Sequence, residues 1–258
     1  MNNDIQFIHL SDCHLGQNKN DKVRGFSTYG CLKAILRKIA LDYPDIDFLL
    51  ITGDISQACT VESYRLFKEL LTEVDIPIYC VPGNHDVPHL LAECPVVSPT
   101  NQLNSFSMGS NTFVLLNTHI KSQNGGELPS VQLNHLNDLL NEQQKSNLFI
   151  ALHHPPIDVE AAWLNDIGLK NKDDFIHTIS QHKNVRAVFF GHVHHEFFQI
   201  KSNINFYSTP STCYQFLAQT EDFAYDNAMP GFRLVKIQSN GTIFSSVVRL
   251  NHIPTDHS

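Results

Sequence analysis

Short apolar runs and segments with apolar residues at helical spacing alternate along most of the chain. The runs are five or six residues long and rich in Ile, Val, Leu and Phe, as is typical of buried strands. Their apolar residues are continuous rather than alternating, so we expect both faces of each strand to be covered. The runs occupy residues 5–10, 48–52, 76–81, 148–152 and 185–190.

Three segments between these runs have apolar residues three or four positions apart, which predicts amphipathic helices. They lie around residues 32–43, 64–71 and 133–140. This alternation favours an α/β fold whose sheets are flanked by further layers. With 258 residues, no internal repeat and no low-complexity linker, the chain is predicted to form a single domain over residues 1–258, structured from about residue 5 to 250.

The last fifth of the chain has strand-like segments joined by short turns, and the SNG sequence at 239–241 is typical of a hairpin turn. We therefore expect an antiparallel region to complete the sheets. Two less regular segments, 87–111 and 157–174, are predicted to form loops or lids over a site. The strand-like segments occupy residues 197–200, 203–208, 231–238 and 242–250.

Composition narrows the class of partner. The chain has 26 acidic and 18 basic residues, a formal net charge of −8 and no cluster of Lys and Arg, which argues against binding to a nucleic acid polymer or an anionic membrane. It has neither a signal-like N-terminus nor a membrane-length apolar stretch, so we expect a cytoplasmic protein. Six cysteines without a CxxC pair are expected to be reduced thiols.

Polar residues follow each of the five apolar runs. Because ligands in layered α/β folds bind at the carboxyl ends of strands, we expect these residues to converge on one site. Gly53, Gly83 and Gly191 each precede a candidate ligand where the backbone must turn sharply. The polar stretches are SDCH at 11–14, GD at 53–54, GNHD at 83–86, HHPP at 153–156 and GHVH at 191–194.

Seven side chains in these stretches supply carboxylate, amide and imidazole groups and no thiolate. This set suits Mn, Fe, Zn or Co and not a structural Cys-rich zinc site. Seven ligands are too many for one ion, so the sequence predicts two divalent ions that share one carboxylate. The candidate metal ligands are Asp12, His14, Asp54, Asn84, His153, His192 and His194.

Each motif alone has a common structural explanation, such as a turn or an extended exit from a strand. Five such motifs at five strand ends together favour a metal centre. His154 and His195 each follow a candidate ligand and are not expected to bind a metal. Trp163 is expected to pack in a lid or at a dimer contact rather than stack on a base.

The motifs D-x-H, GD, GNHD, HHPP and GHVH, in this order, resemble those of the calcineurin-like metallophosphoesterase superfamily. Their spacing is similar to that of its class III cyclic nucleotide phosphodiesterase branch. The stretches HLSDCHLG, AWLNDIGLKN, STPSTCYQF and PGFRLVKI resemble the bacterial 3′,5′-cyclic AMP phosphodiesterases in particular. The chain departs from its relatives at Gly16, where they often carry an aromatic residue.

This resemblance implies a four-layer αββα sandwich and an enzyme that hydrolyses 3′,5′-cyclic AMP to 5′-AMP, with a hydroxide between two metal ions as the nucleophile. The two divalent transition-metal ions would be Fe, Mn or Zn. Substrate contacts would come from the groups nearest the ions: His14, Asp54, Asn84, His85 and His194. One ion would be held by Asp12, His14, Asp54 and His194, and the other by Asp54, Asn84, His153 and His192.

His85 matches no metal position in the family pattern. A histidine beside Asn84 can reach a non-bridging or the leaving oxygen of the phosphate. His85 is therefore predicted to be catalytic, either by stabilising charge or by delivering the proton to the leaving oxygen, with Asp86 orienting it.

Two other functions stay open from the sequence: a phosphodiesterase for glycerophosphodiesters or other small diesters, and a non-catalytic scaffold with this fold. The scaffold is disfavoured because none of the seven ligands is missing. A homodimer is also left open.

Overall fold

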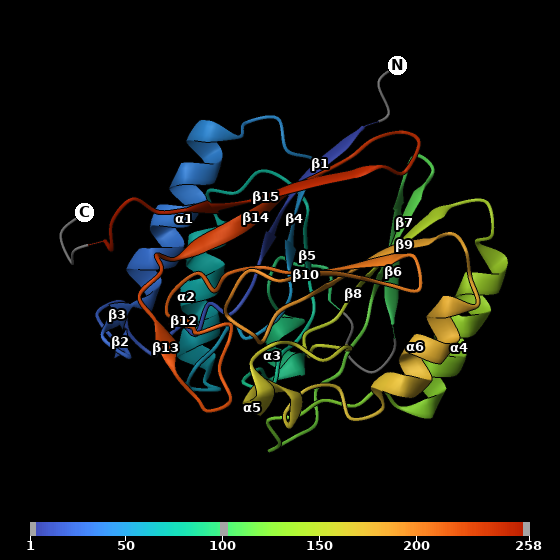
Figure 1. Cartoon of the computed structure of the whole chain (residues 1–258). Helices are drawn as coiled ribbons and strands as arrows, with labels where there is room; N and C mark the ends of the chain where they lie inside the picture. Colours follow the sequence, from blue (N-terminus) through green and yellow to red (C-terminus); the bar gives the residue numbers. More distant parts are fainter. Residues whose placement is uncertain (1–3, 99–102, 255–258) are drawn as a thin grey trace.

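The computed structural model describes residues 4–98 and 103–254. The five apolar runs form strands in two β-sheets, as predicted (Figure 1). One sheet contains the parallel strands β1 (Ile5–Leu10), β4 (Phe48–Ile51) and β5 (Ile78–Cys80), and the other contains the parallel strands β8 (Asn147–Ala151) and β9 (Val185–Phe190). The carboxyl ends within each group therefore lie at one edge of its sheet.

The predicted antiparallel region completes both sheets. In the first, β14 (Gly231–Ile237) pairs antiparallel with β1 and with β15 (Ile243–Arg249), in the order β15-β14-β1-β4-β5. In the second, β10 (Phe198–Lys201) pairs antiparallel with β11 (Ile204–Ser208). The strand order is β10-β11-β9-β8-β7-β6, where β7 is Asn111–Leu115 and β6 is Asn104–Met108. Gly241, with a φ of +84°, lies in the predicted hairpin turn between β14 and β15.

Helices cover the outer face of each sheet (Figure 1). The first sheet packs against α1 (Thr28–Asp42) and α2 (Val61–Leu71), whose first turns are capped by the side chains of Ser27 and Thr60. The second packs against α4 (Ser130–Glu142) and α6 (Lys172–Ser180). The fold is thus the four-layer αββα sandwich that the resemblance implied.

Three apolar layers between these four layers explain why the strand sequences are continuously apolar. In β1, Ile8 and Leu10 pack with the helices, whereas Ile5 and Phe7 point into the space between the sheets. The same division holds in β8, where Leu148 and Ile150 face the helices and Phe149 faces the other sheet. Alternate residues of each strand therefore enter different parts of the core.

The prediction of a loop over 87–111 is wrong in part, because this segment contains the short helix α3 (Pro88–Leu91) and the edge strand β6 (Asn104–Met108). It is followed directly by β7 (Asn111–Leu115), which pairs with β8 and was not predicted. Residues 99–102 of the predicted loop lie outside the described residues. The segment 157–174 likewise contains α5 (Ala162–Asn165) and the start of α6.

Two small hairpins lie outside the sheets: β2 (Lys22–Val23) with β3 (Phe26–Ser27), and β12 (Gln215–Phe216) with β13 (Tyr225–Asp226). Among the described residues, the longest and most apolar helices fall short of what a membrane span requires. The single-domain boundary at residues 1–258 stays a prediction.

Candidate metal centre and active site

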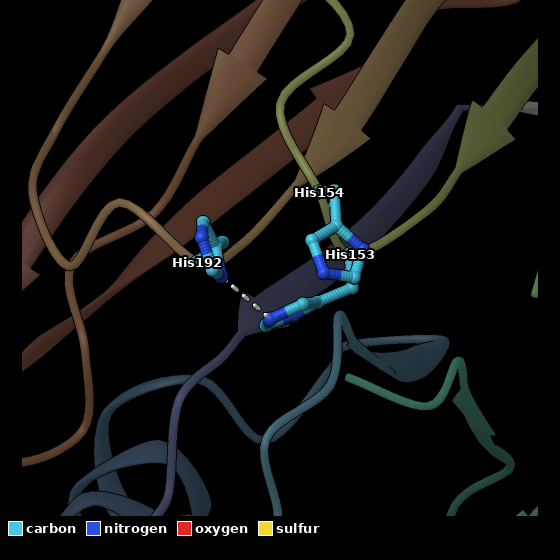
Figure 2. Close-up of side chains that lie close together, drawn as sticks. All are labelled: His153, His154 and His192. Atoms are coloured by element: carbon cyan, nitrogen blue, oxygen red, sulfur yellow. Dashed lines mark hydrogen bonds between the residues drawn. The ribbon is translucent and has the colours of Figure 1, made fainter. Parts of the chain in front are cut away.

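The polar residues that follow β1, β4, β5, β8 and β9 come together in the structure, as predicted. Ligand atoms of Asp12, Asp54 and His153 lie within 4.8 Å of one another although three different strands carry these residues. Figure 2 shows the His153 and His192 rings meeting from the ends of two neighbouring strands. All seven candidate ligands except Asn84 are buried.

A first group of donor atoms is formed by Asp12, His14, Asp54 and His194. His14 Nε2 lies 3.0 Å from His194 Nε2, and His194 Nε2 lies 3.3 Å from Asp12 Oδ1. Asp54 Oδ2 lies 3.7 Å from His14 Nε2. These are the four residues that the family resemblance assigns to one ion.

A second group is formed by Asp54, Asn84, His153 and His192. Asn84 Oδ1 lies 3.1 Å from His153 Nε2 and 3.0 Å from His192 Nδ1, and these two nitrogens are 3.2 Å apart. Asp54 Oδ1 lies 3.5 Å from His153 Nε2. One oxygen of Asp54 thus faces each group, an arrangement that places this carboxylate within reach of both.

The spacing of these atoms fits a divalent transition-metal ion. Ligands about 2.1 Å from an ion are separated by roughly 3.0–3.4 Å when they occupy neighbouring positions of an octahedron or tetrahedron. Most of the distances within each group fall near this range.

In two of the imidazoles, a hydrogen bond made by the second ring nitrogen orients the ring. The Nδ1–H of His153 donates to the Thr52 carbonyl at 2.6 Å, and that of His194 donates to the Tyr214 carbonyl at 3.0 Å. Each bond leaves Nε2 free to point at the site, as is usual for metal-binding histidines.

The protonation states of His14, Asp54 and His153 bear on cation binding. Burial lowers the pKa of His14 to about 3, so its ring is neutral near pH 7 and can act as a ligand. Burial alone would raise the pKa of Asp54, but the neighbouring histidines, His153 foremost, together outweigh burial and hold this pKa well below the usual value. Burial likewise opposes a charge on His153, but Asp54, with Asp12 and the Thr52 carbonyl, raises the pKa of His153 to about 9. A cation that binds His153 therefore competes with a proton.

The backbone of the site is held in an unusual conformation. Five candidate ligands have positive φ values, between 48° and 70°, although none is glycine. Such conformations cost energy and persist where the surrounding fold imposes them, which is frequent at functional sites. They are Asp12, His14, Asp54, His192 and His194.

Only one of the three predicted turn glycines is required for its backbone angle: Gly53 has a φ of +95°. The other two are required because other residues approach closely. A Cβ on Gly83 would lie 2.1 Å from Asp54 Oδ1, and one on Gly191 would lie 1.9 Å from Ser11 Oγ. The space beside these strand ends is therefore occupied by groups from neighbouring strands. At Gly16, a Cβ would meet that of Asp21 at 2.5 Å, which excludes the aromatic residue of the relatives.

His85 lies beside the candidate ligands, with its ring 5.0 Å from that of His14 and its backbone N–H donating to Asp54 Oδ1 at 2.9 Å. The prediction that Asp86 orients His85 is wrong. The buried Asp86 carboxylate instead accepts hydrogen bonds from the backbone N–H groups of Ile55, Ser56 and Gly83 and from the Tyr64 hydroxyl. The side-chain amide nearest the His85 ring belongs to Gln57, at 3.5 Å.

His154 lies against His153 and His192 (Figure 2), but both of its nitrogens have protein partners. The Thr118 hydroxyl donates to Nδ1 at 2.7 Å, and Nε2 donates to the Asn124 carbonyl at 3.1 Å. These bonds occupy both ring nitrogens, and that His154 binds no metal stays a prediction.

His119 was missed by the sequence reasoning. Its Nδ1 donates to the Gly83 carbonyl at 2.9 Å, beside Asn84, and it follows β7. The signal was available: His119 occupies a sixth strand end, which went unnoticed because β7 itself was not predicted.

The comparison with known proteins decides the family. The sequence model described as calcineurin-like phosphoesterase matches residues 5–196. The chain belongs to the calcineurin-like phosphoesterase family. Membership implies divalent metal ions, and the two donor groups provide residues to hold them.

Similar proteins cover nearly the whole chain. A 3′,5′-cyclic-nucleotide phosphodiesterase from Nostoc sp. is 33% identical over 95% of this chain and 92% of its own length. The 3′,5′-cyclic adenosine monophosphate phosphodiesterase CpdA of Haemophilus influenzae is 28% identical over 95% of this chain and 90% of its own length. A dimetal phosphatase from Danio rerio shares the fold, with a TM-score of 0.64 at 15% identity over 95% of this chain and 98% of that one.

Proposed function

We propose that this protein is a metal-dependent phosphodiesterase that hydrolyses 3′,5′-cyclic AMP to 5′-AMP. The observation that carries the proposal is the position of Asp54, whose two carboxylate oxygens face two separate groups of donor atoms. Relatives named for cyclic nucleotide hydrolysis cover more than 90% of this chain, which supports the choice of substrate.

One ion is proposed to be held by Asp12, His14 and His194. The other is proposed to be held by Asn84, His153 and His192. Asp54 is proposed to bind both ions. When bound, two such ions lower the pKa of a water molecule enough to supply hydroxide near neutral pH, and they bind the phosphoryl oxygens. Two carboxylates leave two of the four positive charges uncompensated, so the site attracts a phosphodiester anion although the whole chain carries a net charge of −8. Fe, Mn and Zn all suit this donor set.

The substrate phosphate is proposed to lie against His14, Asp54, Asn84, His85 and His194. His85 is the proposed proton donor to the departing 3′ oxygen, because it is partly exposed beside the candidate ligands and its ring nitrogens are not held by a carboxylate. Its backbone bond to Asp54 fixes the position of the His85 backbone relative to the metal groups. General acid catalysis of this kind contributes roughly 10²–10⁴-fold to rate.

Metal removal and product identity test the proposal. The purified protein is treated with a chelator, supplied with Mn, Fe or Zn, and assayed with cyclic AMP, and the product is separated by chromatography. The proposal requires loss of activity on chelation, recovery with at least one metal, and 5′-AMP as product. Full activity after complete metal removal would contradict it, as would a product of 3′-AMP. An inactive but metal-loaded protein would favour the scaffold.

A cytoplasmic location is proposed together with this activity. All six cysteines are free thiols, as predicted, and free thiols persist in a reducing compartment. The homodimer stays a prediction.

A further inference from the structure

A small aromatic hairpin lies directly against the candidate metal centre. We define the aromatic hairpin as residues 214–226, which include β12 and β13 (Figure 1). The ring of Phe216 stacks on the ring of His194, with centroids 4.1 Å apart and planes 15° from parallel. The ring of Tyr214 lies 4.8 Å from that of His194 and 5.2 Å from that of His14.

The outer side of the hairpin exposes large apolar side chains. Phe223 is 49% exposed and Tyr225 is 43% exposed, and their rings are 4.8 Å apart. Both rings also contact Phe216, at 5.3 Å and 6.0 Å. A continuous aromatic surface therefore runs from the buried candidate ligand His194 to solvent.

Contacts from α5 fix the position of this exposed surface. Trp163 of α5 packs edge-on against Phe216 at 5.1 Å and against Phe223 at 5.0 Å, and the backbone N–H of Ala162 donates to the Thr220 carbonyl at 2.9 Å. Trp163 thus packs against Phe216 and Phe223 of the aromatic hairpin. Aromatic rings fixed in this way lose little conformational freedom when a flat ligand stacks on them.

A cation adjoins the same surface. The guanidinium of the exposed Arg24, in the β2–β3 hairpin, lies over the ring of Tyr225, 5.7 Å from its centroid. Guanidinium planes and aromatic rings are the two kinds of group on which proteins stack nucleobases. Tyr225 therefore supplies an aromatic ring, and Arg24 a guanidinium group, beside the same site.

We propose that the aromatic hairpin binds the purine base of the nucleotide. The rings of Phe223 and Tyr225 are 83° from parallel, so the base stacks on one of them and contacts the other at its edge. The inference rests on the proposed function, because a phosphate at His14 and His194 places the base of the same nucleotide one ribose ring away. The rings of Tyr214 and Phe216 connect these two positions. The glycerol part of a glycerophosphodiester has no ring to stack on this surface, whereas the choline of glycerophosphocholine could contact it through cation–π interactions, so this substrate is included in the competition below.

The test compares two substrates. Cyclic AMP is paired with methyl riboside 3′,5′-cyclic phosphate, which has the same phosphodiester ring and no base. In Phe223→Ala and Tyr225→Ala, the KM for cyclic AMP is expected to rise roughly tenfold, the effect of losing one stacking ring, while the kinetics of the baseless substrate stay unchanged. Tyr225→Phe keeps the ring and is expected to retain the wild-type KM.

Phe244→Ala is the matched control. Phe244 is 55% exposed, and it pairs with Lys236, which in turn pairs with Gln6 near the start of β1, at the end of the sheet away from the site. This variant is expected to behave as the wild type on both substrates.

Three outcomes overturn the inference while leaving the proposed function intact. In the first, wild-type protein hydrolyses both substrates with equal kcat/KM. In the second, the hairpin variants have an unchanged KM for cyclic AMP. In the third, the hairpin variants lose activity equally on both substrates. The last would mean that the hairpin only supports His194. If wild-type protein hydrolyses the baseless substrate but not cyclic AMP, the proposed function itself fails, and the inference fails with it.

Discussion

Replacing Gly191 with alanine is expected to destabilise the protein although its backbone angles suit any residue. The added Cβ would lie 1.9 Å from Ser11 Oγ and 2.7 Å from the Thr52 carbonyl oxygen, both of which are buried. Contacts this short force the neighbouring strand ends apart. The Thr52 carbonyl also accepts the hydrogen bond that orients His153, so the displacement reaches the candidate metal centre.

The magnitude follows from three effects. Overpacking a close-packed interior costs about 1–3 kcal/mol. Loss of the 3.1 Å hydrogen bond from Ser11 Oγ to the Thr52 carbonyl costs about 0.5–1.5 kcal/mol more. Replacing glycine stiffens the unfolded chain and returns about 0.4–1 kcal/mol. The net loss is about 0.5–4 kcal/mol, which corresponds to a fall in Tm of roughly 1–16 °C for a chain of this size.

Thermal unfolding followed by circular dichroism, in the presence of a chelator, measures this loss. Gly125→Ala is the control, because the nearest atom to its Cβ lies 3.4 Å away and its φ is not positive. The variant Ser11→Ala/Gly191→Ala removes the shortest contact and is expected to recover part of the loss. A Tm for Gly191→Ala equal to that of Gly125→Ala, with no coupling to Ser11, would refute the reasoning.

Two further changes test the roles assigned in the site. Asp54→Ala is expected to reduce the content of both metals, whereas His14→Ala mainly weakens one; elemental analysis showing two ions per chain in Asp54→Ala would contradict the bridge. His85→Ala is expected to keep its metals and fold while activity on cyclic AMP falls roughly 10²–10⁴-fold. The loss should be smaller with a nitrophenyl phosphodiester, whose leaving group needs no proton, and an equal loss on both substrates would assign His85 to phosphate binding.

The layered fold could be predicted because burial on both faces leaves a local mark in the sequence. A strand between two packed layers favours apolar side chains on both of its faces, as in Phe48–Ile51, and each such run ended at a polar motif. The strand β7 (Asn111–Leu115) was missed because Asn111 and Thr112 are polar at its start, although both are buried. His119, which follows this strand, was missed with it.

The partners of site residues could not be predicted because they depend on contacts between distant strands. Gly53 and Gly191 look alike in the sequence, yet only Gly53 is needed for its backbone angle, and an added Cβ would meet His153 at Gly53 and Ser11 at Gly191. Asp86 follows His85 directly, but its carboxylate binds Tyr64 and the backbone after Asp54. Sequence proximity therefore identified the members of the site and not the bonds among them.

The most direct test of the proposed function is a competition between two substrates. Metal-replete protein is given equimolar cyclic AMP and glycerophosphocholine, and the kcat/KM of each is obtained from the rate at which it disappears. Cyclic AMP is expected to have the higher kcat/KM, and the amount of 5′-AMP formed is expected to equal the amount of cyclic AMP consumed. Preferential loss of glycerophosphocholine would contradict the account and assign the same metal centre to glycerophosphodiesters.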